Sequence, residues 1–317
     1  MKKFITCIFT TLILIFMCSC SFPKEKRSYT VELITKSVNS DFWKSVYNGA
    51  SAFAAKNNMT IKFVGPKEEK DYREQVCFIE NAIQNKPDAI ILASGDYDLM
   101  AAPMEKAVEN SIPVILIDSS VNSDKWVSFI STDNYLAGKT LAKEMTKRMP
   151  QNKKIGVISF VKNSSPSIER EKGFQNFLNS SSSTLKVINK VYCDSNIDTA
   201  ERLTIEMLKS YPDICGIAGL NAQSATGAAR ALKKLNRNDI FLAGIDCTME
   251  EAEYMDKGIL KTAVLQNPYM MGYYSMETCF KVLNDSAYER NVYIDVSVVD
   301  KSNMFEKENQ QLIFPFY

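Results

Sequence analysis

The segments Glu80–Ser94, ENAIQNKPDAIILAS, and Glu206–Leu220, EMLKSYPDICGIAGL, decide the fold, because each presents the same features in the same order. Each begins in a helical pattern, turns at a Pro-Asp pair and continues as an apolar strand that leads to a polar loop. About 30 residues after each Pro-Asp pair, a further strand ends in Ile-Asp, at Asp118 and at Asp246. An internal repeat of this kind predicts two similar α/β lobes within one chain.

Strand-like and helix-like segments alternate along the chain from Thr30 onward. The expected strands are short and apolar without a two-residue alternation, which is typical of parallel strands buried on both faces. They cover 31–35, 61–64, 89–93, 114–117, 155–160, 185–191, 216–219 and 240–244. The expected helices cover 43–54, 71–84, 99–110, 135–149, 168–179, 199–210, 222–235 and 270–283. The sequence therefore predicts an α/β fold with two similar, doubly wound parallel-sheet lobes.

The composition favours a binding protein over an enzyme. The 317 residues carry a net charge of +1, which argues against a nucleic-acid partner because phosphate binding needs a basic face. The chain has no histidine, which excludes Ser-His-Asp and Cys-His catalysis and every histidine-ligated zinc site. The glycine-rich phosphate loops and the nucleophile elbow G-x-S-x-G are also absent from the sequence. We therefore expect neither catalysis nor a cofactor.

The N-terminus has the pattern of an export signal. Lys2 and Lys3 form a short basic start, and Phe4–Met17 is an almost unbroken apolar run. A basic start followed by an apolar run of this length indicates a signal peptide. The run is too short for a comfortable transmembrane helix. The protein is therefore expected outside the cytoplasm.

The end of this signal resembles that of a bacterial lipoprotein. Small residues lead into a cysteine, and Cys20 is predicted to carry the lipid, with Cys18 as the alternative. A conventional secretory signal is the other interpretation. Residues 1–20 would form the lipoprotein signal peptide and residues 21–28 a tether to the outer face of the cytoplasmic membrane.

Polar and aromatic side chains follow the ends of the expected strands, which is where open α/β sheets bind ligands. Sugar hydroxyls both donate and accept hydrogen bonds, so carboxylate, amide and guanidinium groups suit them, and sugar ring faces pack on aromatic rings. That mixture predicts a sugar site formed by Lys36, Phe42, Trp43, Asp118, Arg170, Asn221, Asp246 and Gln266.

Some of these residues have structural alternatives. Trp43 also fits the apolar face of its helix and could belong to the core. Asp118 and Asp246 could cap the segments that follow them, although their symmetrical recurrence favours a shared role. Arg170 could form a surface salt bridge.

Six short motifs, in this order, resemble the periplasmic binding proteins of the ribose type, also called type I sugar-binding proteins. The motifs are Asn39–Trp43, Pro113–Asp118, Ser131–Asn134, Glu169–Phe174, Ala243–Asp246 and Leu265–Pro268. The resemblance implies two lobes joined by a three-strand hinge. One lobe would hold residues 29–132 plus 267–293, and the other residues 133–266 plus 294–317.

The resemblance also implies roles for individual residues. Phe42 and Trp43 would sandwich a sugar ring, and Ser195 falls where the ribose type places another ring-packing residue. The hydroxyls would be held by Asp118, Arg170, Asn221, Asp246 and Gln266.

Three residues depart from the ribose pattern and put ribose itself in question. Lys36 replaces a small polar residue, Ile245 stands where an aromatic residue is common, and Ser195 lacks a ring. Because Lys36 is the first charged group after an apolar strand, we expect it to enter the cleft. There it could pair with Asp118 or with a ligand oxygen.

The partner that the resemblance implies is an ABC-type permease, to which the protein would present a monosaccharide. The alternative is a sensor of a sugar or an autoinducer that signals to a membrane histidine kinase. In neither alternative is this chain itself an enzyme or the partner of a nucleic acid.

Overall fold

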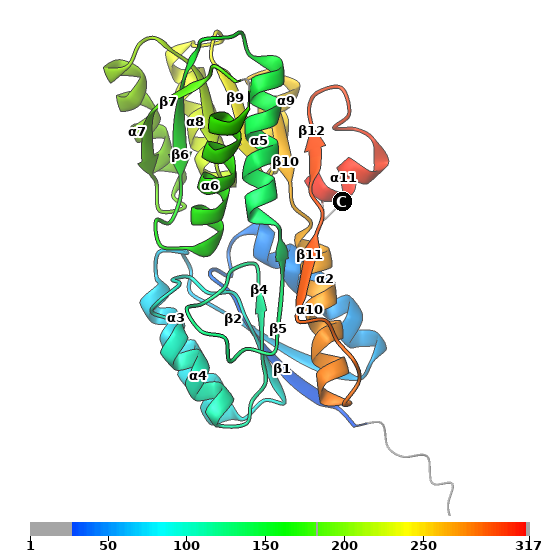
Figure 1. Ribbon diagram of the computed structural model, residues 1–317. Coiled ribbons are helices and arrows are strands. Elements are labelled where there is room, and N and C mark those ends of the chain that lie inside the picture. The colour runs from blue at the N-terminus through cyan, green and yellow to red at the C-terminus, as the bar shows by residue number, and fades with distance from the viewer. Residues whose placement is uncertain (1–26, 182, 315–317) are drawn as a thin grey trace, which may run out of the picture.

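The computed structural model describes residues 27–181 and 183–314 of the chain. Within these residues the strands form two sheets, and each sheet with its helices makes up one of two α/β lobes (Figure 1). The expected signal peptide, most of the expected tether and Cys20 lie outside the described residues.

The first sheet has the strand order β11-β5-β4-β3-β1-β2, and all of its pairs are parallel. Its strands are β1 (Tyr29–Ile34), β2 (Met59–Val64), β3 (Ala89–Leu92), β4 (Val114–Ile117), β5 (Ser128–Thr132) and β11 (Asn291–Ile294). Its helices are α2 (Asp41–Lys56), α3 (Tyr72–Asn85), α4 (Ala101–Glu109) and α10 (Pro268–Leu283).

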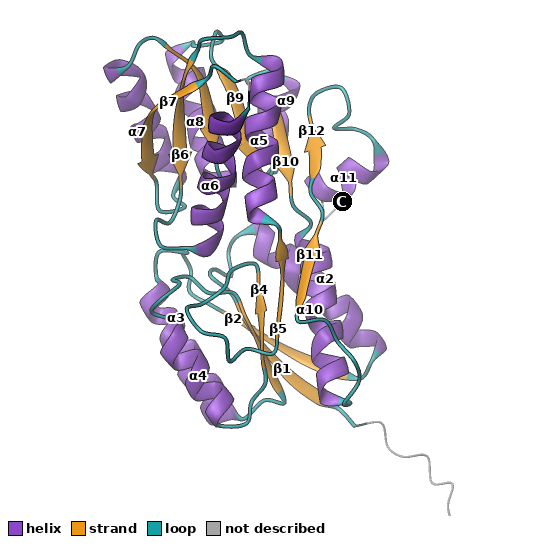
Figure 2. Cartoon of the chain, in the orientation of Figure 1, coloured by secondary structure: helices purple, strands orange, loops and turns teal. Residues whose placement is uncertain are grey.

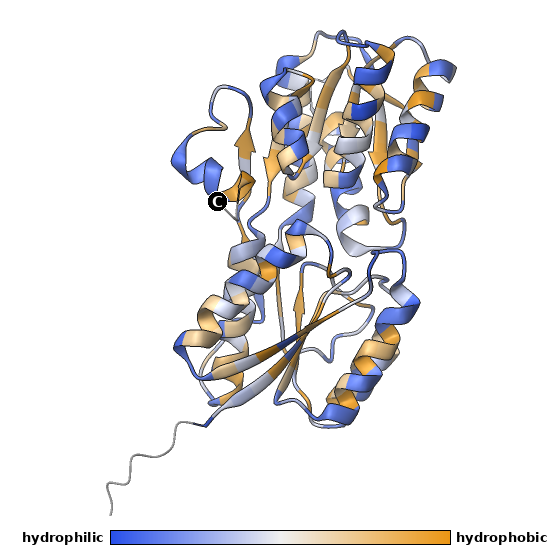
Figure 3. Ribbon diagram, turned by 180° about the vertical axis from the view of Figure 1, so that it is seen from behind, coloured by the Kyte–Doolittle hydropathy of each residue, from blue (hydrophilic) through white to orange (hydrophobic). Residues whose placement is uncertain are grey.

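The central strands β3 and β4 of this sheet are buried on both faces, which explains why they are apolar without alternation. Leu33 and Ile91 pack into the core shared with α2 and α10. Ile34 and Ile90 point to the opposite face and pack with residues of α3 and α4. Figure 3 shows the strands as largely hydrophobic and the outer helix faces as largely hydrophilic.

The second sheet has the order β12-β10-β9-β8-β6-β7 and is parallel except for β12, which pairs antiparallel with β10. Its strands are β6 (Lys154–Ser159), β7 (Lys186–Tyr192), β8 (Ile214–Gly219), β9 (Phe241–Ile245), β10 (Leu260–Leu265) and β12 (Ser297–Val299). The helices of this lobe are α5 (Asn134–Arg148), α6 (Ser165–Ser180), α7 (Ile197–Ser210), α8 (Ala222–Leu235), α9 (Met249–Asp256) and α11 (Lys307–Ile313).

The predicted fold of two doubly wound α/β lobes is confirmed, while several elements had not been anticipated. β5 reads SFIST and β10 reads LKTAVL, so polar residues interrupt the apolar run that marks the other strands. α9 is one of the shorter helices, but it begins in a capping box formed by Thr248 and Glu251. That S/T-x-x-E signature is visible in the sequence and would have located the helix.

Within the described residues, the chain passes three times from one sheet to the other. The connections are Thr132–Asn134 after β5, Leu265–Pro268 after β10, and Ile294–Ser297 between β11 and β12. Figure 2 shows loops of both lobes meeting in the space between the two sheets. The loops that follow the strands thus face each other across one region.

Equivalent helix pairs cover the two sheets, and glycines let their backbones approach. A Cβ on Gly49 of α2 would lie 1.8 Å from the Tyr269 carbonyl oxygen of α10. In the second lobe, a Cβ on Gly138 of α5 would lie 2.0 Å from the Arg170 carbonyl oxygen of α6. Any side chain larger than hydrogen at these positions must push the two helices apart.

We predict that Gly138→Ala lowers the free energy of unfolding by about 2 kcal/mol, the usual cost of overpacking a close contact. The substitution should also displace Arg170, since the added methyl group meets the backbone of that residue. Urea unfolding measures the first effect. Lys143→Ala, at an exposed position on the same helix, is the control and should change stability little. Equal stability of Gly138→Ala and the wild type would contradict this packing.

Candidate ligand-binding cleft

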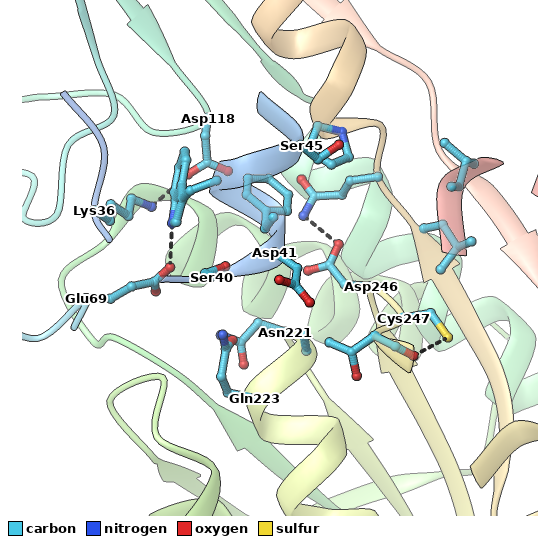
Figure 4. Close-up of a pocket in the computed structure, with 18 of the residues that line it drawn as sticks. Lys36, Ser40, Asp41, Ser45, Glu69, Asp118, Asn221, Gln223, Asp246 and Cys247 are labelled. Atoms are coloured by element: carbon cyan, nitrogen blue, oxygen red, sulfur yellow. Dashed lines mark hydrogen bonds and ion pairs between the residues drawn. The ribbon is translucent and has the colours of Figure 1, made fainter. Parts of the chain in front are cut away.

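A cleft of about 460 Å³ lies between the two lobes and is lined by residues of both. Every sequence-predicted ligand residue except Ser195 lines it: Lys36, Phe42, Trp43, Asp118, Arg170, Asn221, Asp246 and Gln266. Ser195 lies in an adjoining depression instead. Figure 4 shows side chains from the ends of several strands and helices converging on the cleft.

Lys36 enters the cleft and pairs with Asp118, which is the first of the two arrangements that the sequence left open. The Lys36 Nζ lies 2.7 Å from Asp118 Oδ2, and the two residues are 6% and 5% exposed. The Nζ also lies 5.8 Å from the centre of the Trp43 ring. A buried ion pair of this kind presents a polar group to the cleft without leaving an isolated charge.

Asp118 and Asp246 occupy equivalent places in the two lobes. Both have a left-handed backbone, with φ of 62° and 73°, which aspartate adopts more readily than most residues. Each donates its backbone N–H to the neighbouring strand, to Ile130 O and Val264 O respectively, at 2.9 Å. Neither caps a helix, since Asp133 caps α5 and Thr248 caps α9. The capping alternative is therefore wrong.

Arg170 is held rigidly in the cleft wall. Its Nε donates to Asn134 Oδ1 and its Nη1 to the Leu220 carbonyl oxygen, both at 2.8 Å. Its guanidinium lies 5.4 Å from the centre of the Phe160 ring and 4.0 Å from the carboxylate of Asp246. Because Arg170 is 2% exposed, the alternative of a surface salt bridge is wrong. A guanidinium fixed by several bonds is pre-organised to receive a ligand oxygen.

Gln266 and Asp246 form a second polar group on the same wall. Gln266 Nε2 donates to Asp246 Oδ1 at 2.9 Å, while Gln266 Oε1 is buried without a partner in the described part of the chain. Burial raises the pKa of Asp246, the charge of Arg170 lowers it, and Asp118 and Glu69 add smaller upward shifts. A buried acceptor without a partner is costly, and a ligand donor would satisfy it.

Asn221 has a structural role in addition to its predicted place in the cleft. It caps α8, and its Oδ1 accepts hydrogen bonds from the backbone N–H and the hydroxyl of Ser224. The Nδ2 remains as its donor and reaches Ser195 Oγ at 3.2 Å and Gln223 Oε1 at 2.8 Å. Ser195 therefore lies behind Asn221 and contacts it from the adjoining depression.

The aromatic pair forms a single wall in place of the sandwich that the resemblance implied. The Phe42 and Trp43 rings meet edge to face, with centroids 4.9 Å apart and planes at 78°. Trp43 is 1% exposed, belongs to the core of its lobe and also lines the cleft. Its core role is therefore confirmed, while its contact with a sugar stays a prediction. Its indole N–H donates to Glu69 Oε1 at 3.0 Å.

Some residues that line the cleft were not predicted from the sequence. Glu69 lies in the loop after β2, so it follows a strand end as the predicted residues do. Leu312, Ile313 and Phe314 also line the cleft. They come from the C-terminal segment, which offers no strand end, so only the tertiary structure brings them here.

A buried carboxyl group below the cleft gives the fold a pH dependence. Glu251 is fully buried, and burial raises its pKa well above the ordinary range, with a further upward contribution from Asp246. Between the ordinary and the raised pKa, Glu251 binds a proton in the folded state only. Stability therefore falls as the pH rises across that window.

We predict that Glu251→Gln removes this fall in stability. Glutamine keeps an acceptor for the backbone N–H of Thr248, which Glu251 Oε2 accepts at 2.7 Å. Urea unfolding at a series of pH values should show the variant gaining stability over the wild type as the pH rises. Glu253→Gln, at an exposed position on the same helix, should show no such gain. Parallel curves for Glu251→Gln and the wild type would refute this assignment.

Two α/β lobes whose loops hold charged and amide groups around one cleft define a two-lobed solute-binding protein. The model of the periplasmic binding protein domain matches residues 31–287, and the chain belongs to this family. Its resemblance to the ribose type is confirmed as well, since it is 25% identical over 303 residues to the ribose import binding protein RbsB of Bacillus subtilis. That match covers 92% of this chain and 97% of the relative.

Solved structures agree with this assignment. A solute-binding protein of an ABC transporter from Agrobacterium vitis, solved with bound D-fucose, is 33% identical with a TM-score of 0.86. The match covers 90% of this chain and all of that one. A sugar transporter protein from Clostridium phytofermentans is 34% identical with a TM-score of 0.78, covering 87% of this chain and all of that one. The expectation of a non-enzymatic protein is confirmed by the family to which the chain belongs.

The family is extracytoplasmic, in agreement with the expected export of the chain. Among the described helices, none combines the length and the apolar character needed to cross a membrane.

Proposed function

We propose that this protein binds a monosaccharide in the cleft between its lobes. The observation that carries the proposal is the pairing of Asp118 and Asp246 at equivalent strand ends, one on each side of the cleft. Each carboxylate lies beside a buried cation, Lys36 or Arg170. Charged groups held in place by their own partners form strong hydrogen bonds to hydroxyls. The relatives named for ribose and D-fucose support the same ligand class.

The aromatic wall completes a site of this kind. Phe42 offers an aromatic surface for the C–H face of a sugar, while Gln266 and Asn221 offer amide groups to hydroxyls. A cleft of about 460 Å³ falls in the range in which proteins enclose small molecules. Ser195 would act indirectly, by positioning the amide of Asn221.

We propose that binding closes the lobes about the three connections between the sheets. One lobe would comprise residues 29–132 and 267–293, the other residues 133–266 and 294–317. A ligand that contacts both lobes at once favours the closed form, because only that form makes all of its contacts. The closed form would then be recognised by a membrane partner.

Direct contacts already join the lobes at one edge of the cleft. The backbone N–H of Tyr97 donates to the Asn163 carbonyl oxygen, and Asn163 Nδ2 donates to the carboxylates of Asp96 and Asp98, each at 3.2 Å. These bonds link the loop after β3 to the loop before α6. They support a closed form that the protein itself helps to stabilise.

The partner that we propose is an ABC-type permease, reached from a lipid anchor on Cys20 at the outer face of the cytoplasmic membrane. A membrane histidine kinase is the alternative partner. Genes for a permease and an ATPase beside this one would support import, and genes for a kinase and a response regulator would support sensing. Globomycin, which blocks lipoprotein signal cleavage, should cause the uncleaved precursor to accumulate if Cys20 or Cys18 is lipidated.

A thermal-shift screen of the purified chain against pentoses, hexoses, polyols and autoinducer-2 tests the proposed ligand class. A ligand at about 100 times its dissociation constant should stabilise the protein by roughly 2.7 kcal/mol. A clear shift with one sugar supports the proposal and identifies the ligand. The absence of a shift with every sugar, in a protein that unfolds cooperatively, would overturn it.

A further inference from the structure

The cleft carries more acidic than basic groups. Its charged lining consists of two cations, Lys36 and Arg170, and four carboxylates, Asp41, Glu69, Asp118 and Asp246. Within the described residues these carboxylates do not gather into a group that could hold a metal ion. The cleft therefore has a surplus of negative charge spread along its walls.

Most of these carboxylates form an ion pair, and Glu69 is the exception. No ion pair to Glu69 occurs in the described part of the chain. The other pairs are Lys36 with Asp118, Arg170 with Asp246, and Lys44, outside the cleft, with Asp41.

Glu69 is held in place by a buried donor. The indole N–H of Trp43 donates to Glu69 Oε1 at 3.0 Å, and Trp43 is 1% exposed. Figure 4 shows Glu69 and Asp246 on opposite sides of the cleft. The carboxylate is thus oriented by the protein and keeps its charge available to a ligand.

The residues of the adjoining depression, which Ser195 also lines, do not neutralise the surplus of negative charge in the cleft. Besides Glu69 it is lined by the cations Lys67 and Arg230 and by the carboxylates Glu68, Asp194 and Asp198. Arg230 already pairs with Glu250 at 2.7 Å and with Asp198 at 3.6 Å. The excess of negative charge therefore continues outward from the cleft.

Gln266 gives a second, independent indication, which is that the ligand provides hydrogen-bond donors. It is 4% exposed and lines the cleft, and its Oε1 is buried without a hydrogen-bond partner among the described residues. A donor from a ligand in the cleft, a hydroxyl as well as an amine, would satisfy this acceptor. The negative charges of Asp118 and Glu69 also raise the pKa of Asp246, which a cation in the cleft would counteract.

We propose that the ligand of this cleft is an amino sugar, whose ammonium group lies against Glu69 while its hydroxyls serve the remaining polar groups. An ammonium group carries three donors, no acceptor and one positive charge, so it would pair with Glu69 and reduce the surplus of negative charge in the cleft. This inference rests on the proposed sugar-binding function and narrows its ligand class.

Calorimetric titration with matched sugars tests the inference. The probes are D-glucose, D-galactose and D-mannose, each with its 2-amino-2-deoxy form and its N-acetylated form. We expect at least one amine to bind tenfold or more tightly than both its parent and its N-acetyl derivative, and its affinity to fall as salt is raised. Binding of a neutral sugar as tightly as its amine would overturn the inference and leave the proposed function standing. The absence of binding by every probe and every sugar of the thermal-shift screen would overturn both.

The variant Glu69→Gln tests whether the Glu69 carboxylate causes the preference for an amine over its parent sugar. Glutamine keeps an acceptor for the Trp43 indole while removing the charge, so the preference for the amine over its parent should fall at least fivefold. Glu80→Gln, an exposed position on α3 of the same lobe, makes the same charge change away from the cleft and should keep the preference. An unchanged preference in Glu69→Gln would contradict the assignment of this residue.

Discussion

Replacing Arg170 by alanine is expected to abolish detectable sugar binding and to lower the free energy of unfolding by about 3 kcal/mol, the cost of breaking a buried ionic network. The variant would leave Asn134 Oδ1 and the Leu220 carbonyl oxygen without their donor. It would also remove the cation nearest to Asp246. Urea unfolding and calorimetric titration measure the two effects.

Two further variants separate binding from folding. Arg170→Lys keeps the charge but cannot reproduce the guanidinium geometry, so it should recover part of the stability and little of the binding. Arg202→Ala removes an exposed arginine paired with Glu206 and should change neither property measurably. Sugar affinity within threefold of the wild type in Arg170→Ala would show that the site lies elsewhere.

Lys36→Met is expected to lower the free energy of unfolding by about 3 kcal/mol, since it leaves the buried carboxylate of Asp118 without its cation. Methionine fills a similar volume, so the loss would reflect the charge more than the packing. Urea unfolding at neutral pH measures the effect. Sugar affinity should fall as well, because Asp118 would no longer be held in place.

A double-mutant cycle tests the reason for this loss. The double variant Lys36→Met with Asp118→Asn should be more stable than Lys36→Met alone, because no unpaired charge remains in the cleft. Lys154→Met, which breaks the exposed pair with Asp213, is the control and should cost less than 1 kcal/mol. Additive effects of the two cleft substitutions would contradict the pairing.

The sequence was sufficient to predict the two lobes because their central parallel strands, such as β3 and β4, are buried on both faces and are apolar throughout. The repeat that ends in Asp118 and Asp246 predicted that the lobes would present equivalent groups, and the shared left-handed backbone of these residues reflects that equivalence. Strand ends also located the cleft lining, since parallel strands end at one edge of a sheet. Lys36 was also predicted to enter the cleft from its place after a strand, although this residue departs from the ribose pattern.

What the sequence did not predict depends on tertiary geometry. The angle between the Phe42 and Trp43 rings follows from helix packing, which the order of residues does not encode. The capping bonds of Asn221 decide which of its atoms a ligand can reach. Leu312–Phe314 reach the cleft only because the C-terminal segment folds back beside it.

The binding site is tested most directly by calorimetric titration of the best ligand from the sugar screens into the wild-type chain and into Asp246→Asn. Asparagine keeps the shape of the side chain and an acceptor for Gln266, but it removes the charge next to Arg170. We predict one site per chain in the wild type and an affinity at least a hundredfold lower in the variant. Equal affinity in the two proteins would show that the sugar does not bind between the lobes.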